Sequence, residues 1–169
     1  MAAYWSVVNF REAYGLHASN GILFNHESPR RGSDFVTRKI TLAVGAIARG
    51  ETDHITLGNI DAERDWGYAG DYVKAMAAMC DNEVSGDWVV ATGESYSVRD
   101  FLILALDAAG LDGARWEEYV RFDPRYMRPS EVPVLKGNPA KIKADLGWEP
   151  EHDLGSLVNM MVQHDLIRS

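Results

Sequence analysis

The sequence has one cysteine and no long apolar run. A single cysteine excludes an internal disulfide, and because Cys80 follows Met76, Ala77 and Met79 we expect a buried, unreactive thiol. No stretch approaches the roughly 18 consecutive apolar residues of a membrane helix, and residues 1–15 lack the apolar core of a signal peptide. We therefore expect a cytoplasmic protein that has no membrane partner.

An excess of positive charge is also missing. Lysine and arginine number 17 against 25 aspartates and glutamates, which gives a net charge of -8. Such a balance argues against a broad nucleic-acid interface, so any anionic ligand must be bound by a local cluster of cations. The five histidines lie far apart in the sequence, with no pair at metal-ligand spacing, and no metal site is predicted.

The 169 residues suffice for one domain with its own core, and the apolar patterns alternate between helical and strand periods. Helices are expected over residues 4–14, 36–47, 72–80, 98–109 and 154–162, with a short one between Asn138-Pro139 and Gly147. Strands are expected over 18–24, 55–57, 88–91 and 119–122. The result is one mixed α/β body whose strands are too few for a complete sheet.

Several element boundaries carry their own signals. Ser33 or Asp34 is expected to cap the helix that Gly50 ends, and residues 97–100 resemble a capping box ahead of the next long helix. The inward-facing positions predicted by the helical period are Val73, Met76 and Ala77 in the third helix, Val98, Phe101, Leu102, Ala105 and Ala109 in the fourth, and Leu154, Leu157, Val158, Met161 and Val162 in the last.

The segment 21–32, GILFNHESPRRG, is the most informative part of the chain. An apolar run that ends in amide, imidazole, carboxylate and guanidinium groups is typical of a buried strand that delivers polar side chains to the ligand-binding edge of an α/β sheet. Adjacent Arg30 and Arg31 suit a phosphate or the acidic surface of a partner. A solvated basic turn after a core strand is an equally good interpretation of this segment alone.

Four polar loops follow apolar elements, at residues 25–31, 58–66, 92–94 and 125–131, and three of them contain arginine. The planar fork of arginine suits bidentate capture of a diphosphate. Each candidate has a plainer alternative: Arg64 between Glu63 and Asp65 as a salt bridge, residues 128–131 as a rigid turn, and Lys39 as a solvated side chain. Spacing alone indicates an anion or nucleotide pocket and nothing finer.

Seven motifs in order carry a resemblance to a known family: NGILFNHESPRRG, FVTRKIT, LGNIDAERDWGYAGDYV, VVATGESYSVRDF, DPRYMRPSEV, GNPAKIKADLGWEP and the closing helix. From about Tyr4 to Leu166 the chain resembles the GDP-mannose 4,6-dehydratases, NADP-dependent lyases of the extended short-chain dehydrogenase/reductase family. HESPRRG, RDWGYA and RPSEV in succession are far more specific than a lone glycine motif.

The resemblance implies a role for each matched residue. Asn25 would contact the substrate, and His26 and Arg31 the NADP cofactor. Positions around the guanosine are matched by Val36, Lys39, Leu57, Gly58 and Asn59, diphosphate ligands by Arg64 and Arg128, and a ribose ligand by Glu131. Ser28 to Arg31 would form a loop that crosses to a neighbouring subunit, which implies a homo-oligomer. Glu63 stands where a basic residue is expected and Pro133 where an acidic one is common, and residues 81–87 make a longer loop than usual.

The resemblance further implies a C-terminal fragment, 1–169, with a substrate-binding lobe and the last elements of a Rossmann-like parallel sheet at about residues 1–26 and 86–93. The family's Gly-rich cofactor loop, its catalytic Thr/Ser and Glu and its Tyr-x-x-x-Lys pair have no match, so no catalytic residue is expected in this chain. The family converts GDP-mannose to GDP-4-keto-6-deoxymannose and water, a step of deoxyhexose and GDP-fucose biosynthesis. We expect an isolated chain without activity.

Two explanations of such a chain remain open. It is either an enzyme half that works with an N-terminal half-enzyme, or a non-catalytic nucleotide-sugar-binding remnant. A related nucleotide-sugar epimerase or reductase is a third reading, against which RDWGYA and RPSEV argue.

Overall fold

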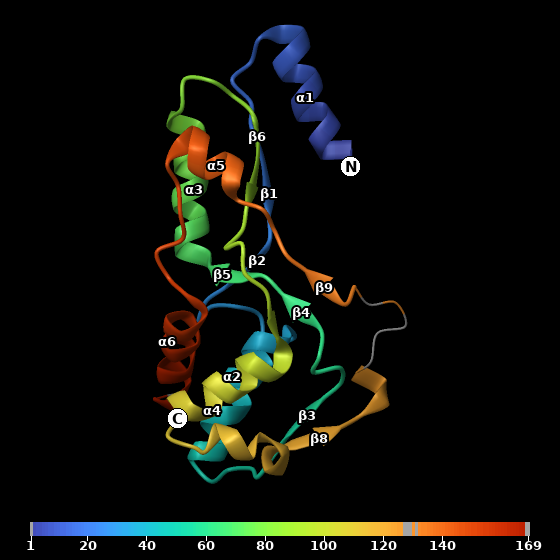
Figure 1. The fold of residues 1–169 in the computed structure, drawn as a ribbon, viewed down its shortest axis with the longest axis vertical. Coiled ribbons are helices and arrows are strands. Elements are labelled where there is room, and N and C mark those ends of the chain that lie inside the picture. The colour runs from blue at the N-terminus through green and yellow to red at the C-terminus, as the bar shows by residue number, and fades with distance from the viewer. Residues whose placement is uncertain (1, 127–129, 131, 168–169) are drawn as a thin grey trace.

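The structure is a computed structural model that describes residues 2–126, 130 and 132–167, an elongated α/β body (Figure 1). Its helices are α1 (Ala2–Tyr14), α2 (Val36–Ala48), α3 (Ala69–Asp81), α4 (Val98–Ala108), α5 (Ala140–Leu146) and α6 (Leu154–Leu166), with two 3-10 helices, η1 (Gly113–Tyr119) and η2 (Pro124–Tyr126). Its strands are β1 (Asn20–Leu23), β2 (Asn25–Glu27), β3 (Ile55–Leu57), β4 (Glu63–Arg64), β5 (Trp66–Tyr68), β6 (Asp87–Val90), β7 (Tyr96–Ser97), β8 (Val120–Phe122) and β9 (Val134–Leu135).

The strands form small separate sheets. The pairs β1–β6, β2–β5 and β3–β8 are parallel and two-stranded, and β4 lies between β7 and β9 in a sheet of three. No sheet within the described residues has more than three strands. Two-stranded parallel pairs are stable only when helices pack on them, so helix packing supplies most of the stability of this fold.

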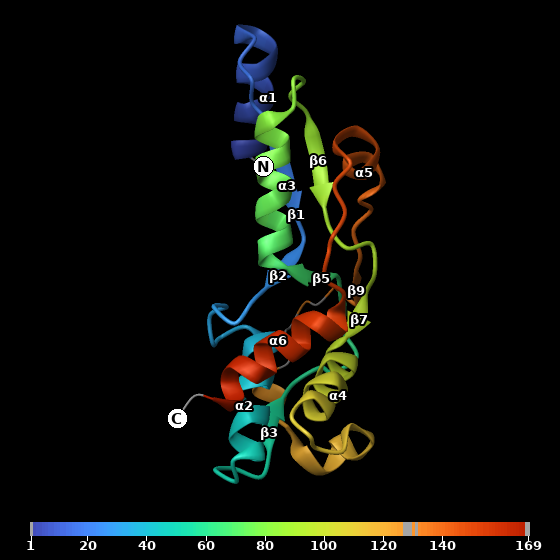
Figure 2. The same ribbon diagram turned by 90° about the vertical axis from the view of Figure 1, so that its left-hand side faces the viewer.

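Two clusters of buried side chains lie at the two ends of the long axis. The larger joins α2, α4 and α6 with β3 and β8, and contains Ile40, Phe101, Leu157 and Met161, which are fully buried (Figure 1). The smaller joins α3, α5 and β6 around Tyr72 (Figure 2). Strands β2 and β5 lie between the two clusters, where the chain passes from one to the other.

Helix α1 stands apart from both clusters and contributes no buried residue (Figure 1). A polar contact attaches it: Arg11 donates two hydrogen bonds to the Asp87 carboxylate, at 2.9 and 3.1 Å, and Tyr4 and Asn20 each donate one. The guanidinium of Arg11 beside Asp87 holds the pKa of that carboxyl well below its ordinary range. No helix in the described part of the chain combines the length and the apolar character needed to cross a bilayer.

The predicted inward face of α3 is wrong. Val73 is 60% exposed, Met76 is 40% exposed and Ala77 is exposed, whereas Tyr72, Ala75 and Met79 are buried. The helix has apolar residues around most of its circumference, so periodicity does not choose between faces; contact with β1 and with Trp148 does. The predicted burial of Cys80 follows the same error, and its thiol is exposed.

Local boundary signals succeed more often. The Ser97–Asp100 capping box is present in full, Gly147 adopts the left-handed conformation that ends α5, and all five predicted positions of α6 are buried. Two details are wrong. Phe35, not Ser33 or Asp34, occupies the N-cap of α2, because residues 29–35 turn before the helix begins, and Leu106 is buried in α4 where Ala109 was predicted.

Candidate functional site

A cavity of about 810 Å³ opens where β2, the start of α2, the end of β3 and η2 meet. We refer to it as the central cavity. The predicted ligand residues that line it are Asn25, Val36, Lys39, Leu57, Gly58, Asn59 and Arg64. Its other walls are Glu27, Ser33, Asp34, Phe35, Thr37, Ala62, Trp66, Val98, Arg125 and Tyr126. The predicted ligand residues, which span 39 positions from Asn25 to Arg64, are thus brought to one cavity by the packing of α2 against the larger core.

Strand β2 presents different residues to its two faces. Asn25 and Glu27 line the central cavity, whereas His26 packs on the ring of Tyr72 in α3, with ring centroids 5.2 Å apart. This follows from the alternation of side chains along a strand. His26, predicted to contact the cofactor, therefore lies on the opposite face from Asn25, predicted to contact the substrate.

Arg31 also lies outside the lining of the central cavity. Its guanidinium carbon stands 3.5 Å above the ring of Phe35, and its Nε lies 3.2 Å from the Glu27 carboxylate. That Nε is buried and makes no hydrogen bond within the described residues. The side chain is therefore held in one orientation by a stacking contact and a charge, which leaves the two terminal nitrogens for another partner.

Glu27 is a site residue that the sequence reasoning did not single out. Its carboxylate is buried, accepts a 2.6 Å hydrogen bond from the Thr37 hydroxyl and pairs with Arg31. Burial raises the pKa of Glu27, against the opposing effects of Thr37 and Arg31. A buried carboxylate is costly unless it is paired, so the burial of Glu27 depends on its contacts with Thr37 and Arg31. In the sequence, its place inside the HESPRRG segment was the signal that could have identified it.

One wall of the central cavity is built by Lys39, Gly58 and Tyr126. The Lys39 amine lies 3.7 Å from the centre of the Tyr126 ring, and burial lowers the pKa of Lys39 while Asp123 opposes that shift. A Cβ on Gly58 would lie 2.5 Å from the Tyr126 carbonyl oxygen, so only glycine fits. Lys39 is thus half-buried and forms part of the wall of the cavity.

Arg64 and its neighbour Asp65 face different partners. The Arg64 guanidinium donates to the carbonyl oxygens of Glu63 and Val132, at 2.7 and 2.8 Å. Asp65 is fully buried and accepts from the Thr92 amide and hydroxyl and from the amides of Gly93 and Gly137. The aspartate therefore holds together the loop that follows β6 and the segment that follows β9. Arg128 and Glu131, the other two predicted substrate ligands, lie outside the described residues.

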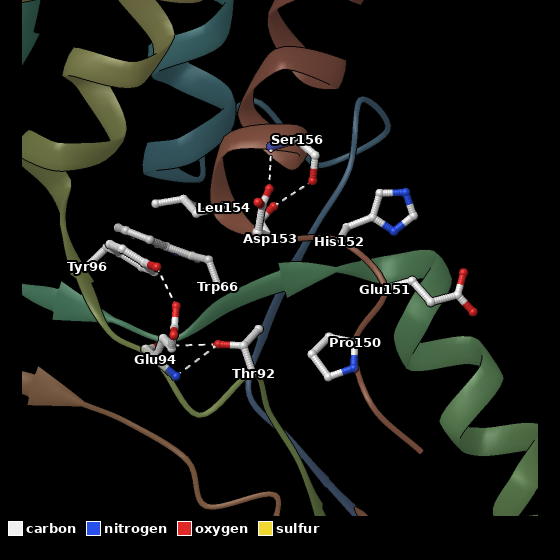
Figure 3. Close-up of a pocket in the computed structure, with 10 residues that line it drawn as sticks. All are labelled: Trp66, Thr92, Glu94, Tyr96, Pro150, Glu151, His152, Asp153, Leu154 and Ser156. Carbon is white, nitrogen blue, oxygen red and sulfur yellow. Dashed lines mark hydrogen bonds between the residues drawn. The ribbon is translucent and has the colours of Figure 1, made fainter. Parts of the chain in front are cut away.

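A second cavity, of about 480 Å³, lies on the far side of Trp66 and is lined by Thr92, Glu94, Tyr96, Pro150, Glu151, His152, Asp153, Leu154 and Ser156 (Figure 3). Both Trp66 and Tyr96 line it, and the Tyr96 hydroxyl donates a hydrogen bond to Glu94, which raises the pKa of Tyr96 to about 12. Three carboxylates make this cavity acidic. In the described part of the chain no His, Cys, Asp and Glu side chains group in a way that could hold a metal ion.

Charge distinguishes the two cavities as sites for an anionic nucleotide. The central cavity carries Lys39, Arg64 and Arg125 against Glu27 and Asp34, and adds the apolar surfaces of Leu57 and Val98. Cations beside an apolar wall suit a phosphate attached to a planar base, whereas the carboxylates of the second cavity repel one.

Comparison with known proteins identifies the family. Residues 1–161 match the family described as GDP-mannose 4,6 dehydratase. The chain belongs to this family. GDP-mannose 4,6 dehydratase 1 of Arabidopsis thaliana is 55% identical over 165 residues, which is 98% of this chain and 45% of that protein. GDP-mannose 4,6-dehydratase of Sinorhizobium fredii is 49% identical over 178 residues, covering 97% of this chain and 51% of that protein. The chain spans about half the length of these curated relatives.

Solved structures agree on the fold. RMD from Pseudomonas aeruginosa, complexed with NADPH, superposes with a TM-score of 0.86 at 19% identity and covers 99% of this chain and 54% of that one. UDP-glucose 4-epimerase from Thermotoga maritima, with UDP-glucose, gives a TM-score of 0.79 at 23% identity, covering 95% and 49%. At these identities the likeness establishes the fold alone: the dehydratase-family chain has the α/β fold of short-chain dehydrogenase/reductase nucleotide-sugar enzymes, over about half their length.

Proposed function

We propose that this chain is the sugar-nucleotide-binding part of a GDP-mannose 4,6-dehydratase, and that the central cavity takes the GDP portion of GDP-mannose. The observation that carries the proposal is the lining of the cavity. Seven of the nine residues predicted to contact the substrate line it, and the other two lie outside the described residues. Family membership alone does not require that they meet in one cavity of suitable charge.

The walls suggest how the nucleotide is held. Val36, Leu57 and Gly58 form an apolar slot for the flat guanine, and the Lys39 and Arg64 cations lie on the same cavity for the diphosphate and base edge. Asn25, at the end of the cavity nearest β5, is left for the hexose. Arg128 and Glu131 join this site in our proposal as ligands of the diphosphate and the ribose.

The opposite face of β2 would hold the cofactor. His26 and Arg31 fit that role, because Arg31 has a buried Nε that makes no hydrogen bond to any residue the structure describes, and its guanidinium is oriented by Glu27 and Phe35. When bound, NADP supplies the hydride acceptor and donor that oxidation and reduction of the hexose require. This chain's part in our proposal is to bind and orient, and the catalytic acid and base come from elsewhere.

The partner that completes the site is, in our proposal, an N-terminal half-enzyme. Within the described residues β1 pairs with β6 alone, and Ile22 on β1 is 45% exposed, so the strand has an open edge beside apolar surface. Production together with the N-terminal half of the Arabidopsis relative should restore conversion of GDP-mannose. A non-catalytic binding remnant would bind GDP-mannose and give no turnover in that mixture. Contact between copies through Ser28–Arg31 would make the assembly a homo-oligomer.

Calorimetric titration of the 169-residue chain tests the proposed function. GDP and GDP-mannose should bind more tightly than UDP. Lys39→Met should weaken GDP binding by about tenfold, because a charge-assisted contact contributes about 1.5 kcal/mol or more. Lys74→Met is the matched control, since Lys74 is an exposed lysine of α3 that pairs with Glu151 outside the central cavity. Equal affinities for GDP and UDP, or equal losses in the two variants, would contradict the proposal.

A further inference from the structure

His26 on β2 is positioned by contacts with two other elements, β5 and α3. In the parallel pair of β2 and β5, His26 lies opposite Gly67. The ring of Tyr72, from α3, occupies the space that a side chain at Gly67 would fill: a Cβ there would lie 2.4 Å from Tyr72 Cε2. The Tyr72 ring then packs on the imidazole of His26 at 5.2 Å, with an angle of 32° between the planes.

The same imidazole makes one specific hydrogen bond. His26 Nδ1 lies 2.8 Å from the carbonyl oxygen of Phe24. A carbonyl oxygen can only accept, so Nδ1 must carry the proton, and in a neutral imidazole Nε2 then bears a lone pair. Nε2 makes no hydrogen bond within the part of the chain that the structure describes. The ring is therefore oriented with an acceptor available.

We propose that Tyr72 is a positioning residue that holds His26 as the Nδ1–H tautomer, so that His26 accepts a hydrogen bond from its ligand through Nε2. The proposal rests on the cofactor role of this face of β2 given above. It specifies the ligand group: a hydrogen-bond donor such as a carboxamide N–H or a sugar hydroxyl. A phosphate oxygen does not suit the neutral ring, because it would face the lone pair of Nε2.

The aromatic ring of Tyr72, and not its hydroxyl, does the positioning. The hydroxyl is fully buried and has no hydrogen-bond partner within the described residues. Burial is the main reason that the pKa of Tyr72 is raised, with Asp65, Glu27 and Asp71 adding to it, so the phenol stays neutral. The ring also packs against Trp148 at an angle of 88°, with centroids 6.0 Å apart, and Trp148 is itself held by a hydrogen bond that it donates to the Asp71 carbonyl oxygen. Phenylalanine should therefore replace Tyr72 without effect on His26.

Nitrogen chemical shifts of the histidine rings test the positioning role in the free chain, at about pH 8, where histidine is ordinarily neutral. We expect His26 to show a protonated Nδ1 and an unprotonated Nε2. His17 is the internal control: its Nε2 lies 2.8 Å from the carbonyl oxygen of Asn82, which requires the opposite tautomer. Tyr72→Phe should keep the His26 pattern, and Tyr72→Leu should give a mixture of tautomers while the His17 pattern persists.

An Nε2–H tautomer for His26 in the unmodified chain would overturn the proposal. An unchanged Nδ1–H pattern in a folded Tyr72→Leu chain would overturn the positioning role. If Tyr72→Leu loses the His17 pattern, and thus does not fold, Gly67→Ala provides the second route, since its methyl group must displace the Tyr72 ring.

Binding of NADPH tests the ligand group. His26→Gln retains an acceptor, whereas His26→Lys supplies only donors and adds a positive charge. We expect His26→Lys to bind NADPH about three- to tenfold more weakly than His26→Gln, the value of one neutral hydrogen bond. Tighter binding by His26→Lys would indicate a phosphate contact and refute the inference. These variants are compared in the chain assembled with the N-terminal half of the Arabidopsis relative. If that assembly binds no NADPH, the proposed cofactor role fails, and the chemical shifts of the free chain still decide the tautomer and the role of Tyr72.

Discussion

Gly58→Ala is the substitution that most directly tests how the central cavity is shaped. The added methyl group would lie 2.5 Å from the carbonyl oxygen of Tyr126 and 2.7 Å from its carbonyl carbon. Non-bonded atoms of this kind are in favourable contact at about 3.5 Å, so the wall must move by about 1 Å. Because the obstacle is backbone, no side-chain rotation relieves the contact.

The size of the effect follows from this displacement. Overpacking costs about 1–3 kcal/mol, and for a chain of this length each kcal/mol lowers the melting temperature by about 2–4 °C. The Lys39 amine packs over the ring of Tyr126, so movement of Tyr126 also displaces that cation. Loss of one charge-assisted contact weakens GDP binding by about tenfold.

The assay combines thermal unfolding with calorimetric titration of GDP, and Gly155→Ala is the matched control. Gly155 lies in α6, and the nearest atom to a Cβ there is at an ordinary 3.7 Å. Its replacement should be neutral or stabilise by up to about 1 kcal/mol. If Gly58→Ala melts and binds GDP like the unmodified chain, the contact between Gly58 and Tyr126 does not shape the cavity.

Two further predictions concern the ion pairs that hold the fold. Arg38→Met leaves the buried carboxylate of Asp165 without its cation and should lower the free energy of unfolding, measured in urea, by about 3–5 kcal/mol. The double variant Arg38→Met with Asp165→Leu should recover most of that loss. A loss below about 1 kcal/mol in the single variant would show that the pair does not join α2 to α6. Asp87 has a depressed pKa because of Arg11, so it contributes stability above the unfolded-state value of about 3.9, and this contribution is lost as the pH falls through the folded pKa. The unmodified chain should therefore be more stable than Asp87→Asn at neutral pH, with a difference that shrinks below about pH 4. Asp81→Asn, on the exposed end of α3, is the comparison variant, and a pH-independent difference for Asp87→Asn would contradict the role of this carboxylate.

Local signals in the sequence predicted element ends and the last helix well. Ser97 and Gly147 act through hydrogen bonds and backbone conformation within a few residues, and the buried stripe of α6 has one interpretation. Helix α3 shows the limit of the same reasoning. Its circumference is apolar on both the Tyr72 side and the Val73 side, so only contact with distant Trp148 and β1 decides which is buried.

Family motifs, and not residue spacing, supplied the candidate ligand residues that line the central cavity. Lys39 and Gly58 gave no signal of their own, and residue spacing could not show that both meet at Tyr126, because that contact depends on how α2 packs against the end of β3. The opposite faces of Asn25 and His26 follow from strand alternation, but only once β2 is known to be a strand. The burial of Glu27 could not be predicted without knowing that Thr37, ten residues away, donates a hydrogen bond to its carboxylate.

The central claim is that this chain binds the sugar nucleotide through the central cavity, and the melting temperature with added ligand tests it most directly. A ligand that binds only the folded chain raises the melting temperature in proportion to the logarithm of its concentration over its dissociation constant. We predict that GDP raises the melting temperature of the 169-residue chain more than NADP does at the same concentration. Stabilisation by NADP with none by GDP would contradict the account.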